Sequence, residues 1–112
     1  MAKKNKKFEN ISDSDYQACW NMDVRLAGII CDNLRMFLQA EKAGPGGCPA
    51  IFESMYGREK CYKEWLNTIR KMIWAFDQYL ATKWQIDKEL ETQERIDEGM
   101  QLFIKYFGYL WI

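Results

Sequence analysis

Four carboxylates near the C-terminus are the first side chains whose spacing suggests chemistry. They follow one another at intervals of three, three and one residues, which places them along one side of a helix. They are Glu91, Glu94, Asp97 and Glu98. All-helical nucleotide pyrophosphohydrolases hold magnesium with such carboxylates, but they need a second, facing pair, for which Glu64 and Asp77 are weak candidates. A charged run on a helix is usually a solvated face, so we expect neither a metal site nor an enzyme.

The chain has no histidine and four cysteines, Cys19, Cys31, Cys48 and Cys61. The lack of histidine excludes catalysis by Ser–His or Cys–His pairs. No Cys-x-x-Cys pair is present, so a zinc site is not expected. Cys19 and Cys31 lie about 18 Å apart if they share one helix, too far to bond each other. We therefore predict four free thiols, no cofactor and a cytoplasmic location.

Trp74 is the centre of a second group of candidate residues. Arg70, Lys71 and Gln78 lie within one helical turn of it, away from the apolar face of their predicted helix. An indole beside cations can stack on a base and attract a phosphate, so this group is a candidate site for a nucleotide or nucleic acid. The alternative is that the loop around Phe52 covers the indole, because large indoles are usually mostly buried.

Three polar residues fall on apolar helical faces and form the third group, namely Asp23, Asn33 and Gln93. A buried carboxylate must be paired or hydrogen-bonded, because an isolated buried charge is very costly. Asp23 is predicted to be satisfied by a Tyr or Trp donor or by a facing Arg; the alternative is a functional carboxylate. The three side chains together could form one buried polar network.

The elements that position these groups are helices. Ser12 is a predicted N-cap for a first helix over about 13–41, and Gly44 ends it before the Gly/Pro segment 43–49. A second helix begins near Glu59 and a turn falls at about 82–87. These boundaries predict an all-α bundle of three main helices, with a long Gly/Pro loop between the first and second. Residues 1–10 are a basic tail, expected to be flexible, and 11–112 form one helical domain.

The third helix carries two apolar seams near its end. Five residues at helical spacing form the first seam: Ile96, Met100, Phe103, Phe107 and Leu110. This stripe is predicted to pack with Trp65, Met72 and Phe76 in the core. Four residues form the second seam: Gly99, Leu102, Tyr106 and Tyr109. Another chain, most simply in a two-fold homodimer, is the expected partner of the second seam; the covering loop and simple exposure are the alternatives.

The segment Glu98–Trp111 resembles the C-terminal segment of a group of small tailed-bacteriophage proteins of uncharacterised function. Similar segments there begin with Glu-Gly and continue with Leu-Phe, Lys-Tyr-Phe and a terminal Leu-Trp. The stretches Trp65–Phe76 and Asp23–Ala27 are also similar to those proteins, whereas the cysteines and the short acidic connection depart from them. The resemblance implies a phage-encoded protein working in a bacterial cytoplasm.

A formal net charge of zero gives no preference for or against a polyanionic partner. No run of about 20 apolar residues is present, so no membrane partner is expected. We therefore predict an accessory protein that binds a host or defence component, either a protein or a nucleotide-type ligand. The alternatives are a phage structural or assembly protein and, less favoured, a carboxylate–metal nucleotide phosphohydrolase.

Overall fold

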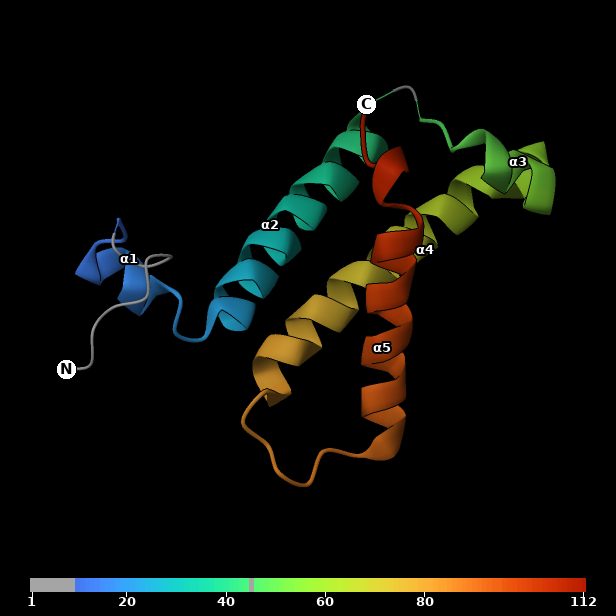
Figure 1. The fold of residues 1–112 in the computed structure, drawn as a ribbon. Coiled ribbons are helices and arrows are strands. Elements are labelled where there is room, and N and C mark those ends of the chain that lie inside the picture. Colours follow the sequence, from blue (N-terminus) through green and yellow to red (C-terminus); the bar gives the residue numbers. More distant parts are fainter. Residues whose placement is uncertain (1–9, 45) are drawn as a thin grey trace.

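The computed structural model describes residues 10–44 and 46–112, and this part of the chain is helical with no strand (Figure 1). The all-α prediction is therefore confirmed. The elements in chain order are α1 (Asp13–Ala18), α2 (Met22–Ala43), α3 (Ala50–Tyr56), α4 (Arg58–Thr82), α5 (Leu90–Lys105) and the 3-10 turn η2 (Phe107–Tyr109). The segment predicted as a long loop between the first two long helices contains α3.

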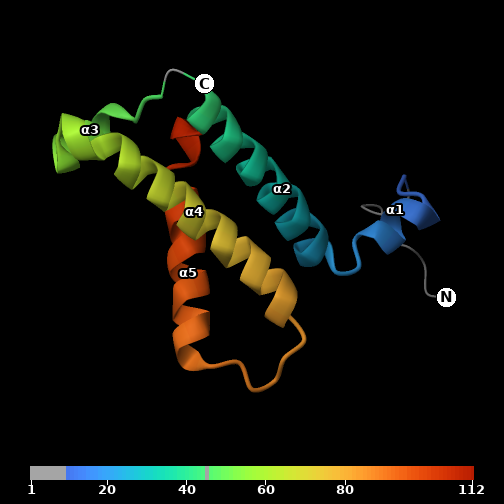
Figure 2. The same cartoon turned by 180° about the vertical axis from the view of Figure 1, so that it is seen from behind.

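Helix α4 is the element on which the others pack. It contacts α2, α3 and α5, whereas α2 and α5 make no extensive contact with each other (Figures 1 and 2). Its buried face repeats at helical spacing through Trp65, Ile69, Met72 and Phe76. A long helix buries its apolar face by packing against the apolar faces of neighbouring helices. Helix α4, with 25 residues, is long enough to contact three of them.

The first helix is shorter than predicted. The sequence pattern suggested one helix over 13–41, but the chain breaks at residues 19–21, where Asn21 adopts a left-handed conformation with φ of 55°. The Ser12 cap is confirmed, because its hydroxyl accepts from the Asp15 N–H at 3.1 Å. Helix α1 buries no residue and packs extensively on no other helix (Figure 1). Most of its side chains are polar, so it has no apolar stripe to hold it in line with α2.

The C-terminal stripe was predicted to be mostly buried in the core, and this is wrong for Phe107, which is 62% exposed. Ile96 is fully buried, and Met100, Phe103 and Leu110 are partly buried against the core. Helix α5 ends at Lys105 and the chain tightens into η2, so a helical wheel extended past that point assigns the wrong face. Tyr106 takes the core position instead, with 5% of its surface exposed.

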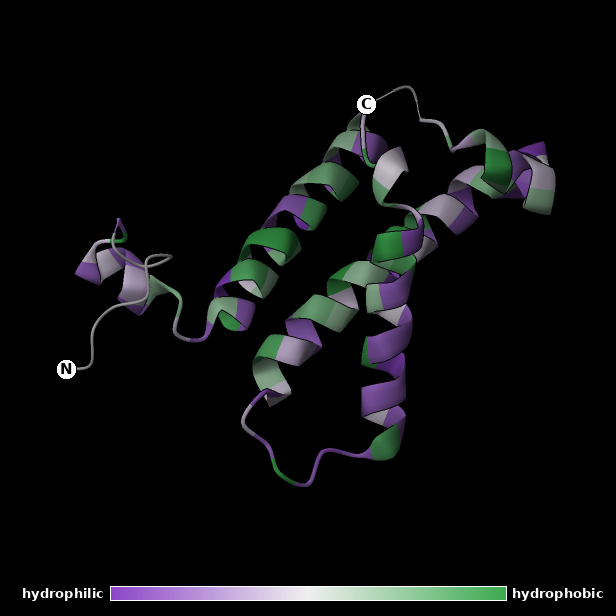
Figure 3. Ribbon diagram, in the orientation of Figure 1, coloured by the Kyte–Doolittle hydropathy of each residue, from purple (hydrophilic) through white to green (hydrophobic). Residues whose placement is uncertain are grey.

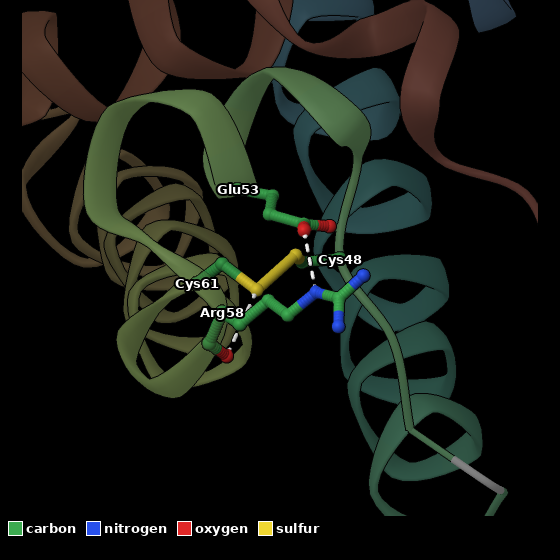
Figure 4. Close-up of polar contacts among 4 residues, drawn as sticks. All are labelled: Cys48, Glu53, Arg58 and Cys61. Carbon is green, nitrogen blue, oxygen red and sulfur yellow. Dashed lines mark hydrogen bonds and ion pairs between the residues drawn. A yellow bond between two sulfur atoms is a disulfide. The ribbon is translucent and has the colours of Figure 1, made fainter.

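Cys48 and Cys61 form a disulfide, which contradicts the prediction of four free thiols (Figure 4). The chain after α2 folds back over the first turn of α4, which brings the two Cα atoms within 6.0 Å. Glu53 and Arg58 form an ion pair beside the bond at 3.0 Å (Figure 4). Cys19 and Cys31 are free, the first exposed and the second buried.

The molecule is elongated. Its radius of gyration is 18.2 Å and its principal extents are 62 × 35 × 22 Å, whereas a compact domain of this length has a radius of gyration of about 13 Å. None of the helices in the described ranges combines the length and apolar character that a bilayer span needs. The elongation arises because the helices gather along one central helix and α1 projects from the end of α2 (Figure 2).

Candidate functional site: an apolar groove between α2 and α5

An apolar groove of about 590 Å³ runs between α2 and the end of α5. Its walls come from one face of α2 and from three residues at the C-terminus. The lining residues are Ile29, Ile30, Asn33, Leu34, Met36, Phe37, Ala40, Phe103, Phe107 and Leu110. The groove exists because α2 and α5 both pack on α4 but not on each other. Figure 3 shows hydrophobic residues recurring along α2, beside an α5 whose first half is largely hydrophilic.

Helix α2 carries two apolar seams. Three residues of the first seam, Ala27, Cys31 and Leu34, are buried against α4. The second seam faces the groove and solvent, where Ile29 is 50% and Met36 is 63% exposed. A helix that is apolar on two sides normally has two partners, and the described chain supplies only one of them.

The opposite wall of the groove is aromatic. Phe103 stacks edge-on against Phe76 of α4 at 5.2 Å and against Phe107 at 5.4 Å between ring centroids. Phe107 thus makes one ring contact within the fold, while most of its surface remains exposed. An exposed aromatic beside an apolar groove offers a partner side chain a large apolar contact.

The predicted polar network of Asp23, Asn33 and Gln93 does not form. Asp23 accepts hydrogen bonds from the Tyr79 hydroxyl and the Lys83 ammonium. It therefore has a tyrosine donor, as predicted, with lysine in place of arginine. Asn33 is exposed in the groove and donates to the Ile29 carbonyl of its own helix at 2.7 Å. Gln93 bonds Lys88 and Asp97 near the start of α5.

The cations around Trp74 are engaged within the protein. The Arg95 guanidinium of α5 lies over the indole at 4.1 Å from the ring centroid, and Lys71 pairs with Glu98 at 3.4 Å. The cavity beside them holds about 70 Å³, far below the ~300 Å³ at which ligand pockets begin. The Arg70 guanidinium donates to the Asn67 side-chain oxygen at 3.0 Å, and the Gln78 backbone carbonyl accepts from the Thr82 hydroxyl. This geometry favours a structural role for Trp74, covered by α5 and not by the loop around Phe52.

The second seam of α5 is covered largely within the chain. Gly99 lies so close to α4 that an added Cβ would come 2.4 Å from the Ala75 Cβ and 2.5 Å from the Lys71 carbonyl oxygen. Tyr106 packs edge-on against Phe52 of α3 at 4.9 Å between centroids. Leu102 is half-buried beside them, and Tyr109 is 40% exposed. The covering-loop alternative therefore describes this seam better than a second chain does.

Helix α3 covers the core, as the apolar residues after Pro49 predict, within the segment otherwise predicted to be a loop. Phe52 is 1% exposed and lies 5.1 Å from Trp65 between ring centroids. The Trp65 indole N–H donates to a Glu41 carboxylate oxygen at 3.1 Å, and the Tyr62 hydroxyl donates to the Glu41 carbonyl at 3.0 Å. The one signal for this arrangement was the apolar pattern after Pro49, which predicts a short helix covering the core.

The acidic run of α5 makes side-chain contacts that need no metal. Asp97 accepts from Gln93 at 2.8 Å, and Glu98 accepts from Lys71. Asp77, a proposed facing carboxylate, pairs instead with Arg35 of α2 at 3.2 Å. Within residues 10–44 and 46–112 no group of three potential ligands is close enough together to hold a metal ion.

Two titrating groups on α2 have shifted pKa values. The hydrogen bond that the Arg35 guanidinium of α2 donates to the Asp77 carboxylate of α4 raises the pKa of Arg35. Burial raises the pKa of the Cys31 thiol, which contacts the Ile73 carbonyl oxygen at 3.8 Å. A buried thiol with a raised pKa is a poor nucleophile, so Cys31 acts as a packing residue.

Comparison of the chain with protein-family models, with curated proteins and with solved structures finds no match. The class that the fold defines is an all-α protein with a preformed apolar groove. Function must therefore be argued from the groove itself.

Proposed function

We propose that this protein acts by binding another polypeptide, which lays a helix in the groove between α2 and α5. The observation that carries the proposal is the second apolar seam of α2, which faces a groove of about 590 Å³ and packs extensively on no helix of the described residues. Amphipathic helices bind in such grooves through apolar anchors spaced at helical intervals. A docked helix would also complete a bundle whose three main helices are α2, α4 and α5.

The exposed area of the chain supports a role in association. The chain exposes 8528 Å², whereas a compact monomer of 13.4 kDa exposes about 6,500 Å². The surplus is about 2,000 Å² and includes the whole chain before α2 as well as the groove, whereas each partner buries only ~800 Å² in an interface of standard size.

The resemblance to small tailed-phage proteins suggests where such binding would occur. We propose an accessory protein that works in the cytoplasm of an infected bacterium and associates with a host or defence component, or with phage proteins during assembly. An enzymatic role is less well supported, because Asp97 and Glu98 of the acidic run pair with neighbouring side chains. The groove favours a protein partner over a nucleotide, since its lining offers few polar groups to orient one.

Site-specific photocrosslinking in bacterial cells tests this function. A photoreactive amino acid at Met36 lies in the groove, and one at Lys42 lies on the same helix outside the groove lining. We expect covalent polypeptide adducts from position 36 and none of comparable yield from position 42. Mass spectrometry of the adducts identifies the partner. Equal or absent crosslinking at the two positions would overturn the proposal.

A further inference from the structure

We infer that the helix that fills the groove is α2 of a second copy of this chain, so that the protein is a two-fold homodimer paired through α2. The inference rests on the proposed function, because it takes the groove as a docking surface and names the occupant. The predicted dimer seam on α5 is covered by α3 and α4, so the self-contact is assigned to a different helix.

The exposed seam of α2 has the spacing of a coiled coil. Its residues follow one another at four, three, four, three and four positions: Met22, Leu26, Ile29, Asn33, Met36 and Ala40. This alternation is the a/d pattern of two helices that supercoil around each other. From Leu26 to Ala40 these five residues are exposed, so the pattern is not explained by packing within the chain. A seam with coiled-coil spacing fits another seam of the same spacing, and the identical chain always provides one.

Asn33 is the residue that points to a copy of the same chain. It is the one polar residue of the seam, and it lies seven residues from Leu26 and seven from Ala40. A two-fold axis through the middle of the seam brings the two Asn33 amides face to face, where each supplies a donor and an acceptor. A single Asn in such a seam fixes register and oligomeric state at a cost in stability. A purely apolar partner helix would leave the Asn33 side-chain oxygen unpaired, because within the described chain the amide uses its N–H to bond the Ile29 carbonyl.

The groove geometry allows the contact to be reciprocal. The second α2 would lie along the first and against the aromatic wall formed by Phe103 and Phe107, and the two-fold operation repeats this contact on the other side. The dimer would thereby cover the 62% exposed Phe107 and the 63% exposed Met36 of each chain. The area surplus derived above is enough for this interface and leaves α1 free for other contacts.

Sedimentation equilibrium of the full chain tests the inference. We expect a dimer at tens of micromolar, and Met36→Glu should raise the dimer dissociation constant at least about 100-fold, because each dimer contains two altered seams. Ile86→Glu is the matched control, since Ile86 is 97% exposed in the α4–α5 connection, and it should leave the constant unchanged. Circular dichroism checks that both variants retain wild-type helicity. A monomeric wild type, or equal effects of the two variants, would overturn the inference.

Asn33 provides a test with the opposite sign. Asn33→Leu should lower the dissociation constant about tenfold or admit higher oligomers, as removal of a seam Asn does in coiled coils. In a Cys19→Ser background, Asn33→Cys should form an intermolecular disulfide on mild oxidation, and Lys42→Cys should not. Weaker association in Asn33→Leu, or equal crosslinking from positions 33 and 42, would refute pairing through this seam. If the wild type is monomeric but Met36 crosslinks a foreign polypeptide in cells, the proposed function stands and this inference fails. A monomeric wild type that also gives no crosslink from Met36 would reject both the proposed function and this inference.

Discussion

Gly99 offers a sharp test of the contact between α4 and α5. A Cβ at this position would lie 2.4 Å from the Ala75 Cβ and 2.5 Å from the Lys71 carbonyl oxygen, whereas carbon atoms in contact lie about 3.5–4.0 Å apart. In Gly99→Ala, α5 must therefore move away from α4 by roughly 1 Å or more. One of the two obstacles is backbone, so no side-chain rotation relieves it.

The expected change in stability is a difference between two effects. Overpacking of this kind costs about 1–3 kcal/mol, and replacing a mid-helix glycine by alanine returns about 0.5–1 kcal/mol. Because both contacts lie below 3 Å and one is backbone, the overpacking cost falls in the upper part of that range, about 2–3 kcal/mol, and we expect Gly99→Ala to lower the free energy of unfolding by about 1–2.5 kcal/mol. Gly28→Ala is the matched control in α2, because its Cβ would meet no atom within 4 Å, and it should raise the free energy of unfolding by about 0.5–1 kcal/mol.

Urea unfolding followed by circular dichroism, at one protein concentration for all variants, measures both changes. With a denaturant dependence of about 1–3 kcal/mol/M, the Gly99→Ala midpoint should fall by roughly 1 M. Ala75→Gly in the Gly99→Ala background should restore stability only in part, because the Lys71 carbonyl contact remains. A Gly99→Ala variant as stable as the wild type would show that α5 does not approach α4 as closely as described.

Four further predictions concern the disulfide, the buried thiol, an ion pair and the tryptophan cluster. Without reductant, the native protein should show one rapidly reacting thiol, Cys19, two thiols when denatured, and four only after reduction; four unreduced thiols would contradict the disulfide. Because burial raises the pKa of Cys31 above its ordinary value of 9.0, its neutral form stabilises the fold below that pH, and this contribution is lost as pH rises further. Thermal melts should therefore show a larger loss of stability as the pH rises above 9 for wild type than for Cys31→Ala. Asp23→Asn should cost about 0.5–1 kcal/mol in urea melts, a discounted figure because the carboxylate is 39% exposed, and no change would show that the bond to Lys83 contributes nothing. Because an arginine already covers the Trp74 indole, nucleotide titrations should give no saturable fluorescence change; a change lost in Trp74→Phe would restore the nucleotide hypothesis.

Local features of the sequence predicted much of the helical structure. Periodicity located the long helices, Ser12 marked the first helix start, and the apolar surroundings of Asp23 predicted a tyrosine donor. Each of these features depends on residues within a few helical turns of one another, or on the composition of one helical face. Such local causes can be recognised in a single sequence.

Features that depend on distant contacts were missed. The break at residues 19–21 follows from the absence of a surface for α1 to pack on, which no local pattern reports. The disulfide requires the chain after α2 to return to the first turn of α4, and compartment arguments alone favoured free thiols. Phe107 was placed in the core because the helical wheel was extended beyond Lys105, where α5 ends. The groove likewise became visible only once α2 and α5 were seen to pack separately on α4.

The central position of α4 has a consequence for how the protein unfolds. Since α2 and α5 are joined to each other mainly through α4, either of them can detach without breaking the contacts between α4 and the other, whereas opening α4 releases both. Native-state hydrogen exchange should therefore rank the helices, with the amides around Ile69 and Met72 exchanging at the rate of global unfolding and those of α1 exchanging fastest. Folding kinetics should follow the same order. The α4–α5 pair, close in sequence, closes the shorter loop and forms first, and α2 docks afterwards across the longer one.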